Sequence, residues 1–168
     1  MKYIDPTKLE LLDEKVIKIN RVSQVVKGGR TFGFNAVVAV GDGKGHVGIG
    51  LGKAKQVINA IAKGKEDAKK NIVKIPIING TIPHTIKVKY DGAVVMLKPA
   101  SPGTGVIAGS TIRAIMDQVG VRDILTKCIG SNNVHNVVKA TMKALLSLRD
   151  PYMIAKKRGK TVQEIFQG

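Results

Sequence analysis

The sequence predicts an α+β protein in which two antiparallel sheets, each accompanied by helices, follow one another along the chain. Short stretches in which apolar residues alternate with polar or small ones predict strands buried on one face. Between them lie stretches whose apolar residues recur at the period of an amphipathic helix. The length of 168 residues allows one domain or two small ones, with enough core to fold without disulfide or metal staples.

The first sheet is expected to consist of three consecutive antiparallel strands within residues 15–53. Alternation is clearest over residues 32–40 and 47–51. Glycine-rich stretches at 27–30 and 41–45 separate the strands, because glycine readily adopts the positive φ of tight turns.

A helix is expected over residues 54–72, and it should pack on one face of that sheet. Its lysines fall mostly off the apolar stripe, as in a helix with one solvated face. The stripe consists of Ala54, Val57, Ile58, Ile61, Ala68 and Ile72.

A second α+β region begins after residues 75–80, where the helical period ends and Pro76 is unsuited to a helix interior. Residues 86–90 and 93–97 alternate on either side of Asp91-Gly92, which is a two-residue hairpin signal.

A loop of small residues at 99–105 then leads to a helix over 108–119, which Gly120 closes. A strand over 121–129 and a helix over 134–148 complete a β-β-α-β-α order. This order predicts helices on one side of a sheet.

The predicted organisation has four parts: an N-terminal arm over 1–10, a first domain over 11–74, a second domain over 75–150 and a basic tail over 151–168. The arm is either a loose segment or one or two helical turns opened by a capping box over Thr7–Glu10. A short helix is expected in the tail.

The net charge of +16 is spread over the predicted folded regions instead of being confined to a tail. Residues 1–14 carry −2, residues 15–79 carry +10 and residues 80–168 carry +8. A folded segment this basic repels itself, and a phosphate backbone offsets that repulsion while counterion release adds affinity. The composition therefore predicts a nucleic acid as the partner.

Several other classes of protein are excluded. No apolar run approaches the ~18 to 20 residues of a membrane-spanning helix, and the N-terminus shows no apolar signal core. Cys128 is the single cysteine, which excludes an intramolecular disulfide and fits a reducing cytosol. We therefore expect a soluble, cytoplasmic protein with no membrane partner.

Motifs that resemble nucleotide-binding signatures fail at positions their chemistry requires. The stretch Gly43–Gly48 matches G-x-G-x-x-G but opens a strand instead of a helix. Gly52-Lys53 lacks both the first glycine and the hydroxyl residue of a P-loop. Histidine and cysteine show no metal-ligand spacing, and carboxylates are scattered. We therefore expect no enzyme, no cofactor and no metal.

A glycine loop over 102–110 opens a helix, and helix N-termini can hold phosphate. A phosphate-binding, kinase-like protein is thus a minor alternative, although it needs carboxylates for Mg²⁺ beside the loop. The competing interpretation is a tight packing loop at a domain or partner contact.

The basic region offers candidate RNA contacts. Gly28-Gly29 would let the backbone approach RNA closely, with Lys27 and Arg30 beside it as phosphate partners. Lys53 and Lys55 add charge at the entrance of the predicted helix.

Two further patterns have competing interpretations. Gly48, Gly50 and Gly52 share one face of a strand, which either admits a partner or receives a closely packed helix. Phe32 and Phe34, in a stretch resembling part of an RNA-recognition motif, either stack on bases or belong to the core.

Several motifs, at matching spacing and in order along nearly the whole chain, resemble the bacterial ribosomal protein S5 family. The first 14 residues match least. The motifs are Asn20-Arg21-Val22-Ser23, Val26-Lys27-Gly28-Gly29-Arg30, Val40-Gly41-Asp42-Gly43-Lys44-Gly45, Val47-Gly48-Ile49-Gly50-Leu51-Gly52-Lys53-Ala54, Pro99-Ala100-Ser101-Pro102-Gly103-Thr104-Gly105-Val106-Ile107-Ala108-Gly109 and Ala155-Lys156-Lys157-Arg158-Gly159-Lys160.

The resemblance implies a double-stranded-RNA-binding-like first domain of βββα order, followed by a second α+β domain. It implies a structural constituent of the small ribosomal subunit that binds small-subunit rRNA between head and body and contributes to decoding accuracy. Its implied neighbours are small-subunit ribosomal proteins four and eight and the nearby mRNA, with no homo-oligomer expected. The remaining alternative is a free regulator that binds duplex RNA.

Three groups of site residues follow from the resemblance and from the chemistry of the residues. The rRNA-binding candidates are Asn20, Arg21, Lys27, Gly28, Gly29, Arg30, Phe32, Lys44, His46, Gly48, Gly50, Lys53 and Lys55. An extended loop over Val22–Arg30 is expected to border the spectinomycin site through Val22, Ser23, Lys27, Gly28 and Gly29. Contact with protein four is expected at Gly103, Thr104, Gly105 and Arg113.

Overall fold

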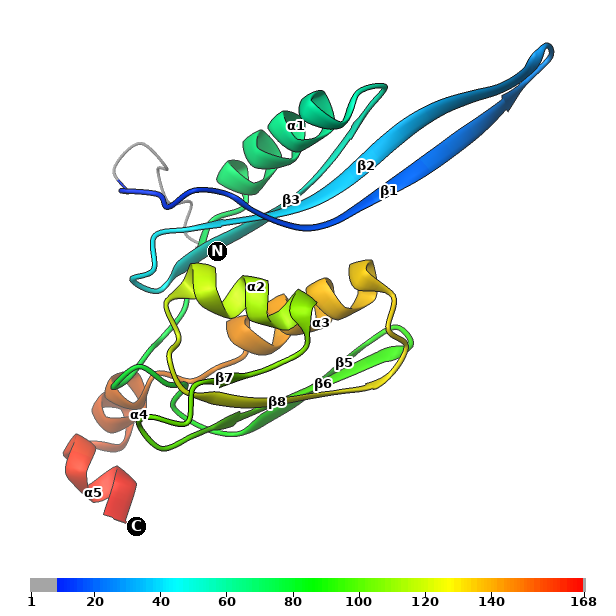
Figure 1. Ribbon diagram of the computed structural model, residues 1–168. Coiled ribbons are helices and arrows are strands. Elements are labelled where there is room, and N and C mark those ends of the chain that lie inside the picture. The colour runs from blue at the N-terminus through cyan, green and yellow to red at the C-terminus, as the bar shows by residue number, and fades with distance from the viewer. Residues whose placement is uncertain (1–8, 168) are drawn as a thin grey trace.

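The computed structural model describes residues 9–167, and its elements stack in four alternating layers (Figure 1). Helix α1 (Val57–Lys70) covers the outer face of a first sheet. Helices α2 (Ser110–Val119) and α3 (Val134–Leu146) form the next layer, and a second sheet closes the stack. The α+β class predicted from the sequence is confirmed.

The first sheet contains β1 (Lys15–Val26), β2 (Gly29–Gly41), β3 (His46–Ala54) and β4 (Val73–Lys74), in that order and all antiparallel. The three expected strands are confirmed. The fourth, β4, was not predicted, because a two-residue strand is too short to display an alternating pattern.

Helix α1 confirms the helix predicted after the third strand, and Ala54, Ile61, Ala68 and Ile72 of the predicted stripe are buried or packed against the core, but Ile58 is not. The residues buried against the sheet are Ala60, Gly64 and Ala68, whereas Ile58 is 79% exposed. These small residues recur every fourth position and form one row along the helix. The row lets the helix backbone approach the sheet closely.

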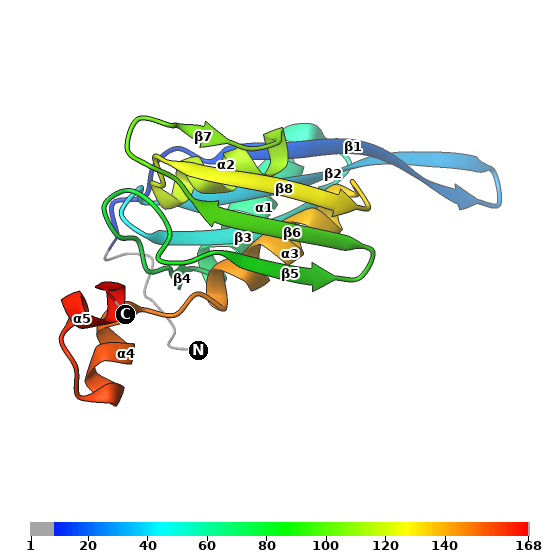
Figure 2. The ribbon, with the colours of Figure 1, turned by 90° about the horizontal axis from the view of Figure 1, so that it is seen from below.

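The second sheet contains β5 (Ile86–Tyr90), β6 (Ala93–Pro99), β8 (Ile124–Gly130) and β7 (Val106–Ile107), in the spatial order β5-β6-β8-β7. The pairs β5–β6 and β6–β8 are antiparallel, while β7 is parallel to β8. The β-β-α-β-α order is thus confirmed, with β7 as an unpredicted addition. Viewed from below, the strands lie in front of α2 and α3, so these helices cover only the inner face (Figure 2).

A single hydrophobic core joins the two sheets. It contains Val37 and Val47 from the first sheet, Leu97 from the second, and Met116 and Leu145 from the helices between them, each no more than 3% exposed. Helix α2 contacts β1, β2 and β3, while α3 contacts β5 and β6. The middle layer is therefore packed on both sides.

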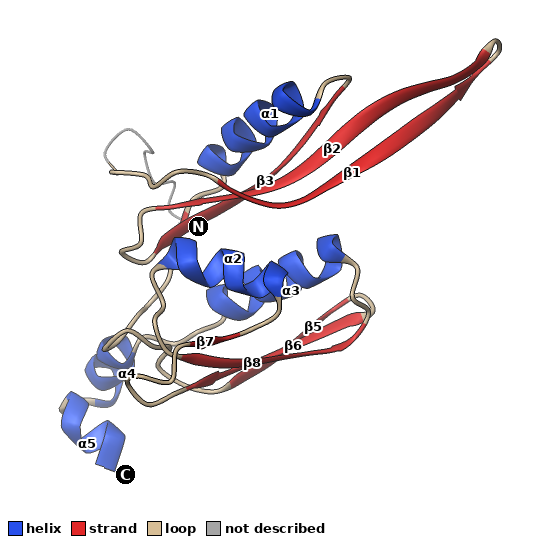
Figure 3. Cartoon of the chain, viewed as in Figure 1, coloured by secondary structure: helices blue, strands red, loops and turns tan. Residues whose placement is uncertain are grey.

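The chain ends in two short helices, α4 (Pro151–Arg158) and α5 (Val162–Gln167), where one was expected (Figure 3). Asp150 caps α4, because its side chain accepts a hydrogen bond from the backbone N–H of Tyr152 at 3.1 Å. Gly159 ends the helix at φ 64°.

Most of the predicted arm, including the start of the capping box over Thr7–Glu10, lies outside the described residues. Residues 9–14, which the structure does describe, are not helical. Among the described residues, no helix combines the length and apolar character needed to cross a bilayer.

Candidate nucleic-acid interface

The strands β1 and β2 extend well beyond the rest of the first sheet. Pairing between β2 and β3 ends at Phe34 and Ala54, but pairing between β1 and β2 continues to Val26 and Gly29. Residues 22–33 therefore form a two-stranded ribbon that projects from the body of the protein (Figure 1). At about 3.3 Å per residue, the ribbon is roughly 17 Å long.

The extended loop that the resemblance implied over Val22–Arg30 is wrong in shape, whereas the separation of the first two strands at residues 27–30 is confirmed. Residues 22–30 continue the antiparallel ladder, and only Lys27 and Gly28 form the turn. The ribbon has no buried face. Gly29 has φ 141°, a conformation that residues with a side chain rarely adopt.

The ribbon presents cations and an exposed aromatic ring. Lys27 and Arg30 at its tip are exposed, and neither takes part in an ion pair within the described part of the chain. The guanidinium of Arg21 lies 3.9 Å from the ring centroid of Phe32, which is 49% exposed. Phe34 instead packs with the cluster beneath α1. Of the two phenylalanines, Phe32 thus remains available to a partner.

More of the predicted residues gather at the base of the ribbon. Asn20, Asn35 and Lys53 lie in one row across β1, β2 and β3, and Lys55 follows directly before α1. Lys53 and Lys55 are exposed. The first turn of α1 carries no acid, and the side chain of its N-cap residue Gln56 caps no backbone N–H group. The unpaired N–H groups and the two lysines make this corner favourable for a phosphate.

Two of the predicted rRNA-binding residues lie at the opposite end of the sheet. Lys44 and His46 adjoin the β2–β3 loop, and β2 separates that loop from the ribbon tip by 12 residue steps, or about 40 Å. They therefore do not belong to the ribbon interface. The prediction grouped them with it because position in the sequence does not show which end of a strand a loop occupies.

His46 has a partner within the chain. Its Nδ1 lies 2.6 Å from Oδ2 of Asp42, whose side chain is only 4% exposed. Oδ1 of Asp42 accepts backbone N–H groups of Lys44 and His46 at 2.8 and 3.0 Å. Burial raises the pKa of Asp42, but these hydrogen bonds outweigh burial and hold the pKa below its ordinary value. His46 thus helps to hold the β2–β3 loop, and its contact with RNA stays a prediction.

Gly48 and Gly50 were predicted to contact rRNA, and the structure contradicts this. Both are buried beneath α1. A Cβ at Gly48 would lie 2.1 Å from the carbonyl oxygen of Ala68, and one at Gly50 would lie 2.1 Å from that of Gly64. The alternative interpretation, close helix packing on the glycine face, is therefore the correct one.

A basic surface that the prediction missed covers the open face of the second sheet. It carries no acidic residue on β5, β6 or β8. The lysines in 86–90 follow the same two-residue period as the apolar residues, so the sequence did contain a signal for them. The exposed lysines of this face are Lys87, Lys89, Lys98 and Lys127.

The Gly103–Gly105 loop, which was predicted to contact a partner protein, is held by hydrogen bonds on its C-terminal side. The N–H of Gly105 donates to Oδ1 of Asp123 at 2.8 Å, and Nη2 of Arg113 donates to the carbonyl oxygen of Val106 at 2.8 Å. Gly103 and Gly105 have φ 90° and 78°, and the Cβ positions of both are open. The structure thus brings Arg113 beside an exposed loop, and contact with a partner stays a prediction.

The same geometry disfavours the kinase-like alternative. Asp123 is buried and engaged by Gly105, and Asp117 pairs with Lys15. Among the described residues, no cluster of three or more His, Cys, Asp or Glu side chains is suited to a metal ion. A carboxylate pair for Mg²⁺ beside the loop is therefore lacking in the described part of the chain.

Comparison with known proteins gives a consistent match over both sheets. The family model described as Ribosomal protein S5, N-terminal domain, matches residues 12–76, and that described as Ribosomal protein S5, C-terminal domain, matches residues 88–158.

Three bacterial relatives are each called Small ribosomal subunit protein uS5. The chain is 54% identical to the protein of Syntrophobacter fumaroxidans over 165 residues, covering 98% of this chain and 99% of the relative. It is 54% identical to that of Bacteroides thetaiotaomicron over 157 residues, covering 94% and 91%. It is 52% identical to that of Flavobacterium psychrophilum over 168 residues, covering 100% and 96%.

Proposed function

Because the chain belongs to the ribosomal protein S5 family, we propose that it is a structural constituent of the small ribosomal subunit and holds small-subunit rRNA through the ribbon. Family membership makes it a ribosomal protein and not an enzyme, located with the ribosome in the cytoplasm. The observation that supports the ribbon as the rRNA contact is its projection beyond the sheet with Lys27 and Arg30 exposed at the tip.

The ribbon is suited to reading the shape and phosphates of RNA. Lys27 and Arg30 contact phosphates on either side of the turn, with arginine as a fork and lysine as a point charge. No atom lies within 4 Å of the Cβ position of Gly28, so the backbone can approach a groove directly. Lys53 and Lys55 contact a second stretch of the RNA backbone at the base of the ribbon. Such contacts recognise RNA by its form and charge.

The finer assignments rest on the resemblance. We place the ribbon tip, with Val22, Ser23 and the Lys27–Gly29 turn, between head and body of the subunit beside the spectinomycin site. The Gly103–Gly105 loop and Arg113 contact ribosomal protein four and influence decoding accuracy near the mRNA entry path.

Ribosomal protein eight is a second protein neighbour in this proposal. Four segments carry these roles: an arm over 1–10, an RNA-binding domain over 11–74, a second domain over 75–150 and a basic tail over 151–168.

The ribbon assignment is tested with Lys27→Glu and Gly28→Asp in the full-length chain. Both variants should fold, because both positions are exposed. Binding to small-subunit rRNA should weaken about tenfold or more, with a shallower dependence on salt, since a phosphate contact is lost. Lys74→Glu, an exposed site near the far end of the sheet, serves as the matched charge control.

Incorporation into small subunits is measured alongside rRNA binding. Normal assembly and unchanged rRNA affinity in both variants would contradict the ribbon assignment. A wild-type chain that does not sediment with small subunits would instead favour the free duplex-RNA regulator.

A further inference from the structure

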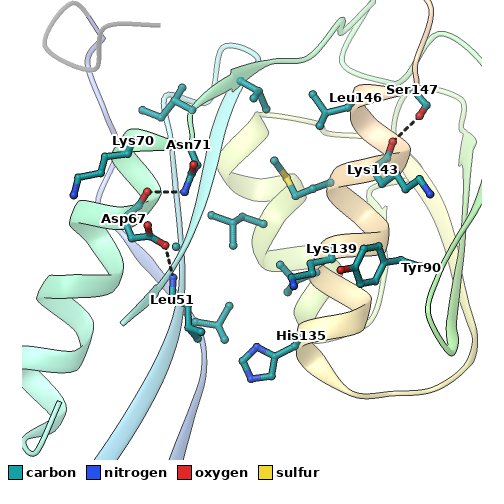
Figure 4. Close-up of a pocket in the computed structure, with 17 residues that line it drawn as sticks. Leu51, Asp67, Lys70, Asn71, Tyr90, His135, Lys139, Lys143, Leu146 and Ser147 are labelled. Carbon is teal, nitrogen blue, oxygen red and sulfur yellow. Dashed lines mark hydrogen bonds between the residues drawn. The ribbon is translucent and has the colours of Figure 1, made fainter. Parts of the chain in front are cut away.

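A groove of about 930 Å³ lies between the first sheet and α3 (Figure 4). One side is formed by β3 and the C-terminal end of α1, and the other by α3. Its lining includes the aliphatic or thioether side chains of Val37, Ile49, Ile72, Val138 and Met142. This size is in the range of pockets that hold ligands or partner side chains.

Apolar surface is also exposed at both edges of the groove. Leu51, on the sheet side, is 51% exposed, and Leu146, on α3, is 39% exposed. Exposed apolar side chains flanking a concave apolar surface are typical of an interaction site.

The charged residues around the groove are mostly cationic. Lys139 and Lys143 lie four residues apart on α3 and form one row beside the opening, and the imidazole of His135 lies one turn before them. Lys70 lies on the opposite side. The acid in the lining is Asp67, and its Oδ2 already accepts the backbone N–H of Leu51 at 3.0 Å.

We propose that this groove docks an acidic, amphipathic helix of a neighbouring protein. The apolar side chains of the helix fill the groove, as in other helix-in-groove complexes. Its carboxylates, spaced four residues apart, align with Lys139 and Lys143. Opposite charges across such a rim fix the register and discourage basic partners.

RNA fits the groove less well. The aromatic ring in the lining, Tyr90, is covered by the ammonium of Lys139, which lies 5.5 Å from the ring centroid. Lys139 thus occupies one face of this ring, which leaves nucleobases less room to stack on it. Their polar edges would also lose water against aliphatic side chains without gaining hydrogen bonds.

The partner's location rests on the proposed function, since the neighbour is another protein of the small subunit. A photoreactive benzophenone amino acid is placed at Leu51 or Leu146 in the full-length chain, and at Ile58 as an exposed apolar control on α1. Small subunits containing each chain are purified and irradiated, and crosslinks are mapped by mass spectrometry. We expect both groove positions, but not the control, to crosslink one helix with apolar residues and carboxylates four residues apart.

Charge reversal separates groove docking from chance proximity. Lys139→Glu combined with Lys143→Glu should lower the crosslinking yield at least tenfold, while Lys156→Glu on α4 should leave it unchanged. All three lysines are exposed, so the variants should fold.

Crosslinks to rRNA, to a segment without acidic residues, or to nothing in particles that contain the chain would each overturn the proposal. Co-sedimentation of the chain with small subunits is scored separately. Its absence would overturn the proposed function and, with it, the partner inferred for the groove.

Discussion

At the tip of the ribbon, a Cβ added to Gly28 or Gly29 would meet no atom within 4 Å, whereas a Cβ added to Gly50 would lie 2.1 Å from a carbonyl oxygen of α1. All three glycines belong to the same sheet or its hairpin turn, and each leaves a strand or turn without a side chain. At the tip, the missing side chains expose backbone to a partner. On β3, they let a helix of small residues pack against the strand. All of these residues are glycines. Whether a helix covers the glycine decides if the missing side chain serves packing or leaves the backbone open to a partner.

The comparison is tested most strongly by the same substitution at both places. Gly50→Ala forces a methyl group into the backbone of α1, and we expect a loss of about 3 kcal/mol or more in the free energy of unfolding. Gly28→Ala places the methyl in open space at a residue without positive φ, so its effect should stay within about 0.5 kcal/mol. Urea denaturation followed by circular dichroism measures both. A loss below about 1 kcal/mol for Gly50→Ala would contradict the packing role.

The far end of the sheet extends the comparison to a polar contact. Asp42→Asn removes the charge that holds the β2–β3 loop, and it should cost about 1–3 kcal/mol at pH 7. The folded-state pKa of Asp42 is depressed below its ordinary value of 3.8. Its contribution is therefore complete above that value and is lost as the pH falls through the folded-state pKa.

Urea midpoints measured from pH 7 to pH 2 check this prediction. The difference between wild type and Asp42→Asn should shrink in the most acidic samples. Glu10→Gln, at an exposed acid, is the control and should behave like wild type. A difference that stays constant to pH 2 would show that the charge of Asp42 contributes nothing.

A smaller test concerns the helix side of the glycine contact. A Cβ at Gly64 would lie 2.8 Å from Cγ2 of Val38, so Gly64→Ala should cost about 1–2 kcal/mol even though alanine favours helices by about 1 kcal/mol. In a Val38→Ala background the added methyl has room, and the same substitution should become neutral or stabilising. A double-mutant cycle measured by urea unfolding gives this coupling. Additive effects would mean that the two residues do not compete for space.

The smallest expected effects separate the two tip glycines. Only Gly29 has a positive φ, so Gly29→Ala should strain the turn while Gly28→Ala should not. We expect faster amide exchange along residues 22–33 in Gly29→Ala, with a change in global unfolding free energy of less than about 0.5 kcal/mol. Equal exchange rates in the two variants would show that the turn tolerates either conformation.

Alternation and helical periods in the sequence identified most of the strands and helices, because each of these elements buries one regular face. The strands β4 and β7 have two residues each, so neither gave a readable pattern. Of the buried row on α1, Ala68 was predicted but Ala60 and Gly64 were not, because small residues contribute little to an apolar pattern.

The candidate site was predictable where residues close in sequence are also close in space. Lys27 and Arg30 flank the turn as expected, and Lys53 and Lys55 lie together at the base of the ribbon. The pairing of His46 with Asp42 depends on how the β2–β3 loop folds. The groove beside α3 is formed by segments that are distant in the sequence. Neither the His46–Asp42 contact nor the groove produces a recognisable pattern of neighbouring residues in the sequence.

The continuous core between the two sheets has a mechanical consequence. Since α2 and α3 pack between the two sheets, the base of the ribbon and the Gly103–Gly105 loop are attached to the same continuous core. Partners bound at these two places would therefore be held at a set separation by one folded protein.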